Sequence, residues 1–520
     1  MRRDFSRLSN REFDLLVCGG GVYGAWTAYD AALRGLRVAI VEQGDWAGGT
    51  SSESSKLIHG GLRYLETHDF KLVLKSLRER ETLLKIAPHR VWPLRFGVPI
   101  YQGGRIGTLK LKAGLVLYDF LANIPGANFV HQYYKHSAFA KRFSFLNDSM
   151  IKSGFVYGDA QTDDARLVLE LIAGAVAVGA VCVNYCRVTG CREENGSIVA
   201  VTVQDMVGHG NAQINARQVV NAVGPWVAET AQGRKWCRLR KGIHLVLPAL
   251  PTEEALLLTA KSDGRVFFII PWYGMTLLGT TDEDYKGNIS QLKVEPGEVN
   301  YLLDEANRYL KISWTAQDIV GSYAGVRAMK RSDSKFPVAM SRDWELKSVG
   351  KNIHFSVGGK ITSARQDAMI IVNTVCSHLG IAAKCTTRTR FFPWASKNYM
   401  EWKRSSNLRA TNLGIEPDCT KWLMRRHGIR VEEVFHIVEL LPELARRITS
   451  SLPFIYADLL LCARDEMVVH LDDLLRRRMP LLILAKLSED ELCRIVTVVS
   501  SALGWNEDTA KAEIKACRTR

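Results

Sequence analysis

Three glycines, Gly19, Gly21 and Gly24, form a GxGxxG pattern between an apolar run at residues 13–18 and a segment of helical character. The first glycine permits a tight turn, the second lets the backbone approach a diphosphate, and the third lets a helix pack closely on a strand. The unpaired N–H groups at the start of that helix would hold the negative charge of the diphosphate. The pattern predicts a site for a dinucleotide cofactor.

An acidic residue stands where a nucleotide ribose needs a hydrogen-bond acceptor. A second apolar run spans residues 36–41, and Glu42 follows it directly. Strand, glycine-rich turn, helix, strand and acidic residue make a complete βαβ unit, in which the carboxylate hydrogen-bonds a ribose hydroxyl. We expect this unit to contact the cofactor through the following residues: Gly19, Gly20, Gly21, Val22, Gly24, Glu42 and Gln43.

FAD and NAD share this fingerprint, so the residues that follow must decide between them. Residues 50–56 read Thr-Ser-Ser-Glu-Ser-Ser-Lys, a loop with five hydroxyl groups and one lysine. Such a loop suits the wrapping of an extended cofactor, and a solvated surface loop is the alternative.

The segment at residues 50–65, which contains Ile58-His59-Gly60-Gly61, resembles the signature of FAD-dependent glycerol-3-phosphate dehydrogenases, which are DAO-type flavoproteins. Segments similar to that family recur in order along the chain, at residues 78–84, 87–89, 163–167, 221–226, 241–244, 279–282, 322–327, 358–362, 464–467 and 471–478. The resemblance spans nearly the whole chain and extends to the family's C-terminal helical domain.

The resemblance implies oxidation of the secondary alcohol of sn-glycerol 3-phosphate, or of a close phosphorylated polyol, to dihydroxyacetone phosphate. Hydride would pass to flavin N5, a base would take the hydroxyl proton, and cations would hold the phosphate. The family pattern assigns catalytic roles to Arg63, His244, Arg327 and Lys360, with Tyr64 as a further substrate-binding residue. His244 is the candidate base because imidazole titrates near working pH. A core histidine beside a strand is the alternative.

The resemblance also implies cofactor contacts outside the βαβ unit. These residues are Thr50, Ser51, Ser52, Ser55, Lys56, Leu57, Gly224, Gly359, Lys360, Ile361 and Thr362. No metal site is expected, since the eleven cysteines include no CxxC pair and lack metal-ligand spacing.

Four positions depart from the family pattern and leave the exact substrate open. Ala364 replaces an aromatic residue, and Glu53 puts a negative charge inside the polar loop. Tyr23 and Trp26 are bulky for the first helix. An amine or amino-acid oxidase of the same flavoprotein superfamily is a second hypothesis, because a substrate carboxylate also needs an arginine. A non-catalytic scaffold that acts through the basic C-terminal region is a third.

The elements that must position these residues follow an α/β pattern and then an all-helical one. We expect a Rossmann-type FAD-binding domain at residues 1–75, 150–230 and 345–385, with a mixed-sheet substrate domain at residues 76–149 and 231–344. An all-α C-terminal domain is expected at residues 386–520. Within these domains, hairpins are expected at residues 187–204 and 266–279, and helices at residues 165–179, 361–375, 420–426, 430–440 and 456–478.

A net charge of +15 favours anionic partners. No nucleic-acid-binding motif accompanies it, so we expect a small phosphorylated substrate and no nucleic acid. The stretch at residues 90–122 is basic and aromatic, and includes Trp92, Tyr101 and Arg105. It suits an anionic membrane surface, as expected if electrons pass to quinone or another acceptor. A substrate-domain helix with a basic solvent face is the alternative.

Scattered cysteines are typical of reduced thiols in the cytoplasm. The run at residues 167–183 is the nearest to a membrane span, but it contains Glu170 and two glycines and predicts a crossover helix. We expect a cytoplasmic protein, with peripheral association at the cytoplasmic membrane face as a further expectation. A homodimer is compatible with the sequence.

Overall fold

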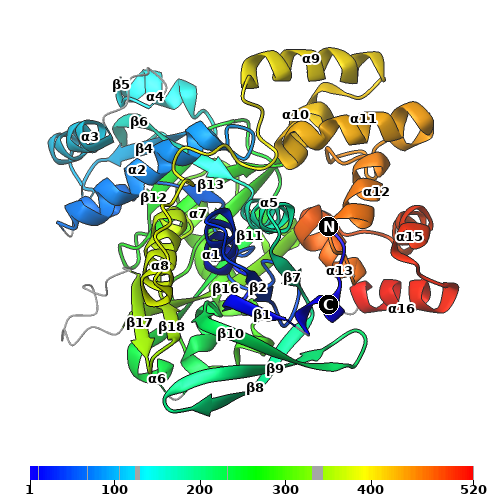
Figure 1. Ribbon diagram of the computed structural model, residues 1–520. Helices are drawn as coiled ribbons and strands as arrows, with labels where there is room; N and C mark the ends of the chain where they lie inside the picture. Colours follow the sequence, from blue (N-terminus) through cyan, green and yellow to red (C-terminus); the bar gives the residue numbers. More distant parts are fainter. Residues whose placement is uncertain are drawn as a thin grey trace.

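A computed structural model describes residues 1–9, 11–66, 68–104, 106–122, 129–230, 232–330 and 344–518. Two β-sheets and a helical C-terminal region make up this part of the chain (Figure 1). The fold class predicted from the sequence, α/β followed by an all-helical region, is confirmed. Arg105 of the basic stretch lies outside the described residues.

The first sheet carries the glycine-rich turn. Its neighbouring strands β18, β10, β1, β2 and β7 run parallel, and β17 forms an antiparallel edge. The strands are β1 (Glu12–Cys18), β2 (Val38–Val41), β7 (Val181–Val183), β10 (Asn211–Asn221), β17 (Glu345–Val349) and β18 (Ile353–Val357). The central strands are buried almost throughout, as parallel strands covered on both faces must be.

Helices cover one face of this sheet and a hairpin covers the other. The helices α1 (Val22–Leu33), α5 (Asp164–Ala177) and α8 (Ala364–Leu379) lie side by side with α1 in the middle; α1 packs on β1 and β2, α5 on β7 and α8 on β10 (Figure 1). The hairpin of β8 (Cys186–Glu194) and β9 (Ser197–Asp205) extends β10 and packs on the opposite face. Its turn residues Asn195 and Gly196 both have positive φ, which a tight hairpin turn requires. This predicted hairpin is confirmed.

The second sheet is mixed, because β12 runs parallel to β4 whereas the other pairs are antiparallel. Its strands are β3 (Leu57–Ile58), β4 (Val91–Tyr101), β5 (Gln132–Lys135), β6 (Ile151–Thr162), β11 (Cys237–Leu247), β12 (Ala255–Thr259), β13 (Val266–Trp272), β14 (Met275–Gly279), β15 (Glu283–Tyr285) and β16 (Gly321–Lys330). β6 belongs to this second sheet. The segment at residues 150–230, expected in the FAD-binding domain, therefore begins with a strand of the second sheet and not of the first.

Helices of the second region are α2 (Phe70–Ile86), α3 (Thr108–Ala122), α4 (His136–Arg142), α6 (Gly233–Trp236) and α7 (Pro296–Asn307). The basic stretch at residues 90–122 is therefore not one helix. Its first part is β4, in which Leu94, Phe96 and Ile100 are buried whereas the intervening Pro93 and Arg95 are not. This alternation has the two-residue period of a strand.

The C-terminal region contains α9 (Tyr399–Asn412), α10 (Pro417–His427), α11 (Val431–Leu440), α12 (Tyr456–Asp465), α13 (Leu471–Asp473), the π-helical turn η9 (Leu474–Arg478), α14 (Leu481–Leu484), α15 (Glu489–Leu503) and α16 (Glu507–Arg518). The helix expected at residues 456–478 is broken after Asp465. Met467 has positive φ, and the Glu466 carbonyl accepts a hydrogen bond from Arg478 Nη2 (2.7 Å) instead of a helical N–H.

This region docks on the second sheet through aromatic side chains. The Trp422 ring stacks on Tyr273, with ring centroids 3.7 Å apart, and meets Trp92 edge-on at 5.8 Å. These residues belong to one continuous apolar core that joins the helices to the sheet. No described helix combines the length and apolar character that crossing a bilayer requires.

Candidate active site

A cavity of about 1800 Å³ is lined by residues of both sheets. It extends from the end of β2 at Glu42 to the short helix η2 (Leu62–Leu65). Typical ligand pockets hold roughly 300–1,000 Å³. The cavity therefore has space for a dinucleotide and a small substrate together.

The glycine-rich turn forms one wall of this cavity. Gly19 has a φ of +111°, and a Cβ there would lie 2.6 Å from the Ala222 carbonyl oxygen. A Cβ on Gly24 would collide with the Gly19 carbonyl oxygen, so α1 packs against β1 only with glycine at this position. Gly21 directly precedes α1 as its N-cap residue and lines the cavity, where the helix N-terminus favours negative charge. These features fit the diphosphate of a dinucleotide.

Glu42, which lines the cavity, is held in place by backbone hydrogen bonds. Its two carboxylate oxygens accept hydrogen bonds from the backbone N–H groups of Gly20 (2.6 Å) and Gly44 (2.9 Å). Burial raises the pKa of Glu42, and these backbone hydrogen bonds oppose the rise. Because a carboxylate oxygen accepts more than one hydrogen bond, Glu42 retains capacity for a ribose hydroxyl.

A second loop, before α8, also lines the cavity and contacts the first turn of α1. Gly359, Lys360 and Ile361 line the cavity. Tyr23, which the sequence marks only as unusually bulky, accepts a hydrogen bond from the Lys360 N–H (3.0 Å) and donates one to Asp367 (2.8 Å). A Cβ on Gly359 would collide with the Tyr23 hydroxyl. The large side chain of Tyr23 therefore fixes this loop.

Cationic side chains gather on the same cavity. Arg63 and Tyr64 on η2, Arg327 on β16 and Lys360 all line it. Lys360 Nζ lies 3.1 Å from Ser76 Oγ and 4.3 Å from the Tyr64 ring centroid. Arg327 contacts Thr280 Oγ1 at 3.4 Å. Three cations on one cavity suit a dianionic phosphate.

His244 lies behind the cavity wall rather than on it. Its side chain is buried, and its Nε2 shares a hydrogen bond of 2.8 Å with Ser55 Oγ, which lines the cavity. Burial, followed by the charges of Arg327 and Lys56, lowers the pKa of His244 well below its ordinary value. His244 is therefore neutral near pH 7 and reaches the cavity through Ser55.

Most of the other predicted cofactor residues line the cavity: Gly19, Gly21, Val22, Glu42, Gln43, Thr50, Ser51, Ser55, Leu57, Gly224, Gly359, Lys360 and Ile361. Five lie behind its wall: Gly20, Gly24, Ser52, Lys56 and Thr362. Lys56 Nζ is buried and ion-paired with Asp164 (2.8 Å), so its side chain shapes the polar loop from inside. Ser52 Oγ likewise bonds within the loop, to the Gly49 carbonyl.

Among the polar residues that line the cavity and to which the sequence assigns no role are His59, Arg240 and Asp282. Arg240 Nε lies 2.9 Å from Asp282 Oδ1, and Asp282 is 3.8 Å from Arg327. Arg240 and His244 are four residues apart on β11, and even spacing puts strand residues on one face. This spacing could have identified Arg240 from the sequence as a neighbour of His244 on the same face of the strand.

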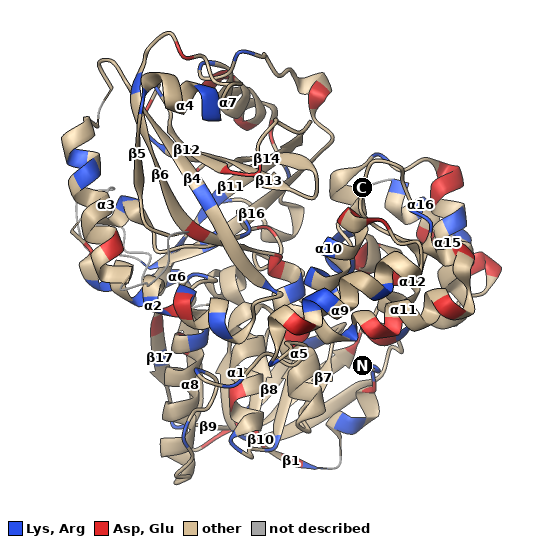
Figure 2. Ribbon diagram, turned by 90° about the horizontal axis from the view of Figure 1, so that it is seen from above, with Lys and Arg blue, Asp and Glu red and all other residues tan. Residues whose placement is uncertain are grey.

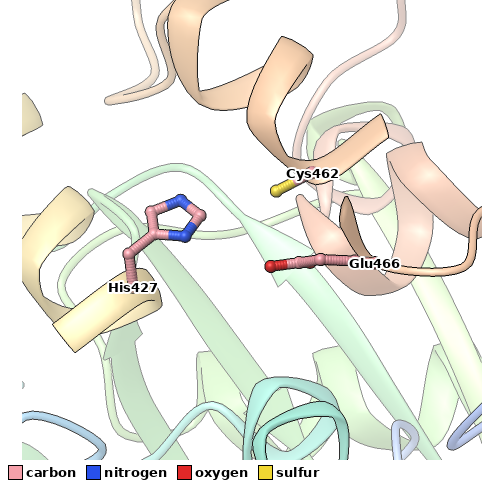
Figure 3. A group of neighbouring side chains, drawn as sticks. All are labelled: His427, Cys462 and Glu466. Atoms are coloured by element: carbon pink, nitrogen blue, oxygen red, sulfur yellow. The ribbon is translucent and has the colours of Figure 1, made fainter. Parts of the chain in front are cut away.

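His427, Cys462 and Glu466 point toward one another at the base of the helical region (Figure 3). Their ligand atoms lie within 4.8 Å of each other, as metal ligands would. Both Glu466 oxygens, however, accept hydrogen bonds from Arg166. Burial raises the pKa of the Cys462 thiol well above its ordinary value, which disfavours the thiolate that binds metals. This cluster is an ion-pair contact between α5 and the helical region.

Comparison with known families agrees with this geometry. Residues 14–381 match the FAD dependent oxidoreductase family, and residues 385–510 match the C-terminal domain of alpha-glycerophosphate oxidase. The first match ends at residue 381 and the second begins at residue 385.

Individual relatives cover almost the whole chain. A glycerol-3-phosphate dehydrogenase of Synechocystis sp. is 34% identical over 99% of this chain and 97% of its own length. An aerobic glycerol-3-phosphate dehydrogenase of Staphylococcus aureus is 33% identical over 91% of this chain and 87% of its own.

Solved structures extend the comparison to the fold. Glycerol-3-phosphate dehydrogenase from Bacillus halodurans, complexed with FAD, has a TM-score of 0.80 at 26% identity, covering 99% of this chain and 95% of its own. Glycine oxidase from Geobacillus kaustophilus shares the fold alone, with a TM-score of 0.54 at 18% identity over 72% of this chain and 97% of its own. The chain belongs to the FAD-dependent oxidoreductases and, among them, to the glycerol-3-phosphate dehydrogenase family.

Proposed function

We propose that this protein is an FAD-dependent dehydrogenase that oxidises sn-glycerol 3-phosphate to dihydroxyacetone phosphate. The observation that carries the proposal is one cavity that joins a glycine cradle for a diphosphate to Arg63, Arg327 and Lys360. FAD supplies the two-electron acceptor that oxidation of an alcohol needs. The relatives named above support this substrate.

The residues around the cavity divide the remaining work. Arginine binds a phosphate bidentately and lysine acts as a point charge, so Arg63 and Lys360 hold the substrate phosphate. Arg327, about a quarter exposed, stabilises the negative charge that develops on the substrate oxygen as its proton leaves. The phosphate contacts thereby orient the carbon that loses hydride.

Proton removal proceeds through Ser55 and His244. Ser55 Oγ faces the cavity and shares its hydrogen bond with His244 Nε2. In the tautomer protonated at Nδ1, Nε2 accepts the Ser55 proton, while Ser55 accepts the proton of the substrate hydroxyl. The low pKa of His244 keeps the imidazole neutral, so one ring nitrogen retains the lone pair that accepts a proton.

A substrate panel with a dye electron acceptor tests this function. We expect a much higher kcat/KM for glycerol 3-phosphate than for glycerol, glycine or D-alanine, because only the first presents a phosphate to the cations. A preference for glycine or D-alanine would instead support an amino-acid oxidase. A purified protein that binds no flavin would support a non-catalytic scaffold.

We further propose that α3 binds an anionic membrane surface and that a quinone of the membrane receives the electrons from the flavin. The exposed face of α3 carries an apolar stripe of Leu109, Ala113, Val116 and Phe120, whose spacing repeats with the helical period. Leu109 and Phe120 are about four-fifths exposed, at 82% and 79%. The helix also carries lysines, and both views place it at the edge of the molecule opposite the helical C-terminal region (Figure 1, Figure 2). Such a face suits the boundary between headgroups and acyl chains.

Co-sedimentation with vesicles of phosphatidylglycerol and phosphatidylcholine tests the membrane contact. Phe120→Glu should weaken binding by about tenfold, since the apolar contact of one large side chain is lost. Leu408→Glu is the matched control, because Leu408 is 65% exposed on α9 in the helical region. Equal binding by both variants would reject this surface. Reduction of a short-chain quinone, compared with oxygen consumption, tests the acceptor.

A further inference from the structure

The helical C-terminal region reaches the cofactor cavity itself. Asp472 on α13 and Arg477 on η9 line the cavity together with Glu42. Since the carboxylate at the end of the second strand contacts the ribose of the adenosine, this is the nucleotide end of the cavity. Side chains more than 400 positions apart in the sequence therefore meet at the place where the adenosine would lie.

Three consecutive arginines of η9, here called the arginine triplet (Arg476, Arg477 and Arg478), contact two loops of the first sheet. Arg477 Nε and Arg478 Nη2 donate to the Asp45 carboxylate at 2.5 Å and 2.8 Å. Arg476 lies 3.8 Å from Glu53 in the polar loop. The turn is π-helical, with a hydrogen bond from the Met479 N–H to the Leu474 carbonyl (2.9 Å), and such turns are often found at functional sites.

The contacts of the arginine triplet are buried and charged. The side chain of Asp45 is 1% exposed, that of Arg478 is fully buried, and that of Arg477 is 11% exposed. Burial by itself would raise the pKa of Asp45, but the guanidinium groups of Arg478 and Arg477 hold it below its ordinary value. Removing one partner from a buried ion pair leaves a charge uncompensated, so these contacts hold the loop strongly.

Asp45 connects the arginine triplet to the glycine-rich turn. The next residue, Trp46, is fully buried against Gly20, where a Cβ would lie 2.5 Å from the indole ring. The Ala47 N–H then donates to the Gly20 carbonyl (3.0 Å). A shift of Asp45 would therefore displace both the turn that receives the diphosphate and the adjoining Glu42.

We propose that the helical C-terminal region is part of the FAD site: Arg477 and Asp472 form the outer wall of the adenosine pocket, and the arginine triplet positions the loop of Asp45. FAD retention thus depends on the docked helical region. The inference rests on the proposed function, because it assigns this cavity to FAD. Arg477 is a positioning residue and takes no part in the chemistry.

The test compares Arg477→Gln with Arg447→Gln in the full-length protein. Arg447 is the control: its side chain is 16% exposed and paired at 2.6 Å with the more exposed Glu416 and Asp418, and all three residues belong to the helical region and do not line the cavity. The dissociation constant of FAD is measured by titrating apoprotein and following quenching of flavin fluorescence. Thermal unfolding of each apoprotein measures general destabilisation.

We expect Arg477→Gln to weaken FAD binding by about tenfold or more, and Arg447→Gln by less than about twofold. Arg477→Lys, which keeps the charge, should recover part of the affinity. Equal FAD affinities for the wild type and Arg477→Gln would overturn the inference, as would equal losses in the Gln variants of Arg477 and Arg447 with equal thermal shifts. A wild-type protein that binds no FAD would instead overturn the proposed function, so the two failures are distinguishable.

Discussion

Two sets of charged side chains line the same cavity, and the protein holds them differently. At the nucleotide end, the buried Asp45 accepts a hydrogen bond from Arg477 Nε at 2.5 Å, and Glu42 accepts two backbone hydrogen bonds. On the substrate side, Arg327 lies 3.8 Å from its carboxylate neighbour, and Lys360 contacts a hydroxyl and an aromatic ring. Buried ion pairing fixes a binding surface, whereas Arg327 and Lys360 line the cavity, where we propose that they meet the substrate.

Blocking the nucleotide end should have the largest effect. Gly21→Val places a branched side chain where the diphosphate approaches the start of α1, so we expect complete loss of bound FAD and of activity. Flavin content of the purified protein measures this. Gly190→Val is the control, because no atom lies within 4 Å of a Cβ at that strand position. A fully loaded Gly21→Val protein would mean that the diphosphate lies elsewhere.

Removing a cation on the substrate side should separate FAD binding from the chemistry of the reaction. Arg327→Ala should retain FAD but lower kcat/KM for glycerol 3-phosphate by about 10³-fold, because a charge that stabilises the transition state is lost. Arg238→Ala on the neighbouring strand β11 is the control, since that arginine is 47% exposed in a surface ion pair. Unchanged kinetics in Arg327→Ala would remove Arg327 from the mechanism.

His244, which lies behind the cavity wall, should give kcat an unusual pH dependence. His244→Gln should lower kcat by about 10²-fold or more, since a general base is lost. In the wild type, the pKa of His244 lies below its ordinary value, so the neutral base persists as the pH falls through 6.5. We expect kcat at saturating substrate to stay level across that pH. A loss of kcat with a midpoint near 6.5 would show that an ordinary, solvated histidine is the base.

The smallest expected effect is that of salt, to which the two sets of charged side chains should respond differently. Exposed charges are screened by salt, whereas buried pairs are screened much less. The KM for glycerol 3-phosphate should therefore rise several-fold between about 0.01 and 0.15 M salt, while the dissociation constant of FAD changes by less than about twofold. Parallel changes in both constants would mean that the two sets of charges are equally accessible.

Sequence patterns predict those parts of the site whose residues lie close together in the chain. Gly19, Gly21, Gly24 and Glu42 lie in one βαβ unit, and their roles follow from spacing. The aromatic docking of Trp422 on Tyr273 and the contact of Arg477 with Asp45 join residues far apart in sequence, which no local pattern records.

Other differences between the sequence-based expectations and the structure arise from the way in which the elements pack. The family resemblance implies a catalytic role for His244, but only the tertiary fold shows that Ser55 stands between it and the cavity. Residues 456–478 have a helical pattern, yet the buried pairing of Glu466 with Arg166 and Arg430 accompanies a break in the helix. The alternation in β4 was readable, but the basic residues around it pointed to a surface helix instead.

Anaerobic mixing of the purified protein with glycerol 3-phosphate tests the central claim most directly, since it follows the flavin itself through one turnover. We predict that the flavin absorbance near about 450 nm bleaches with glycerol 3-phosphate and persists with glycerol, which lacks the phosphate. Flavin that remains oxidised with glycerol 3-phosphate, or bleaches equally with glycine, would contradict the account.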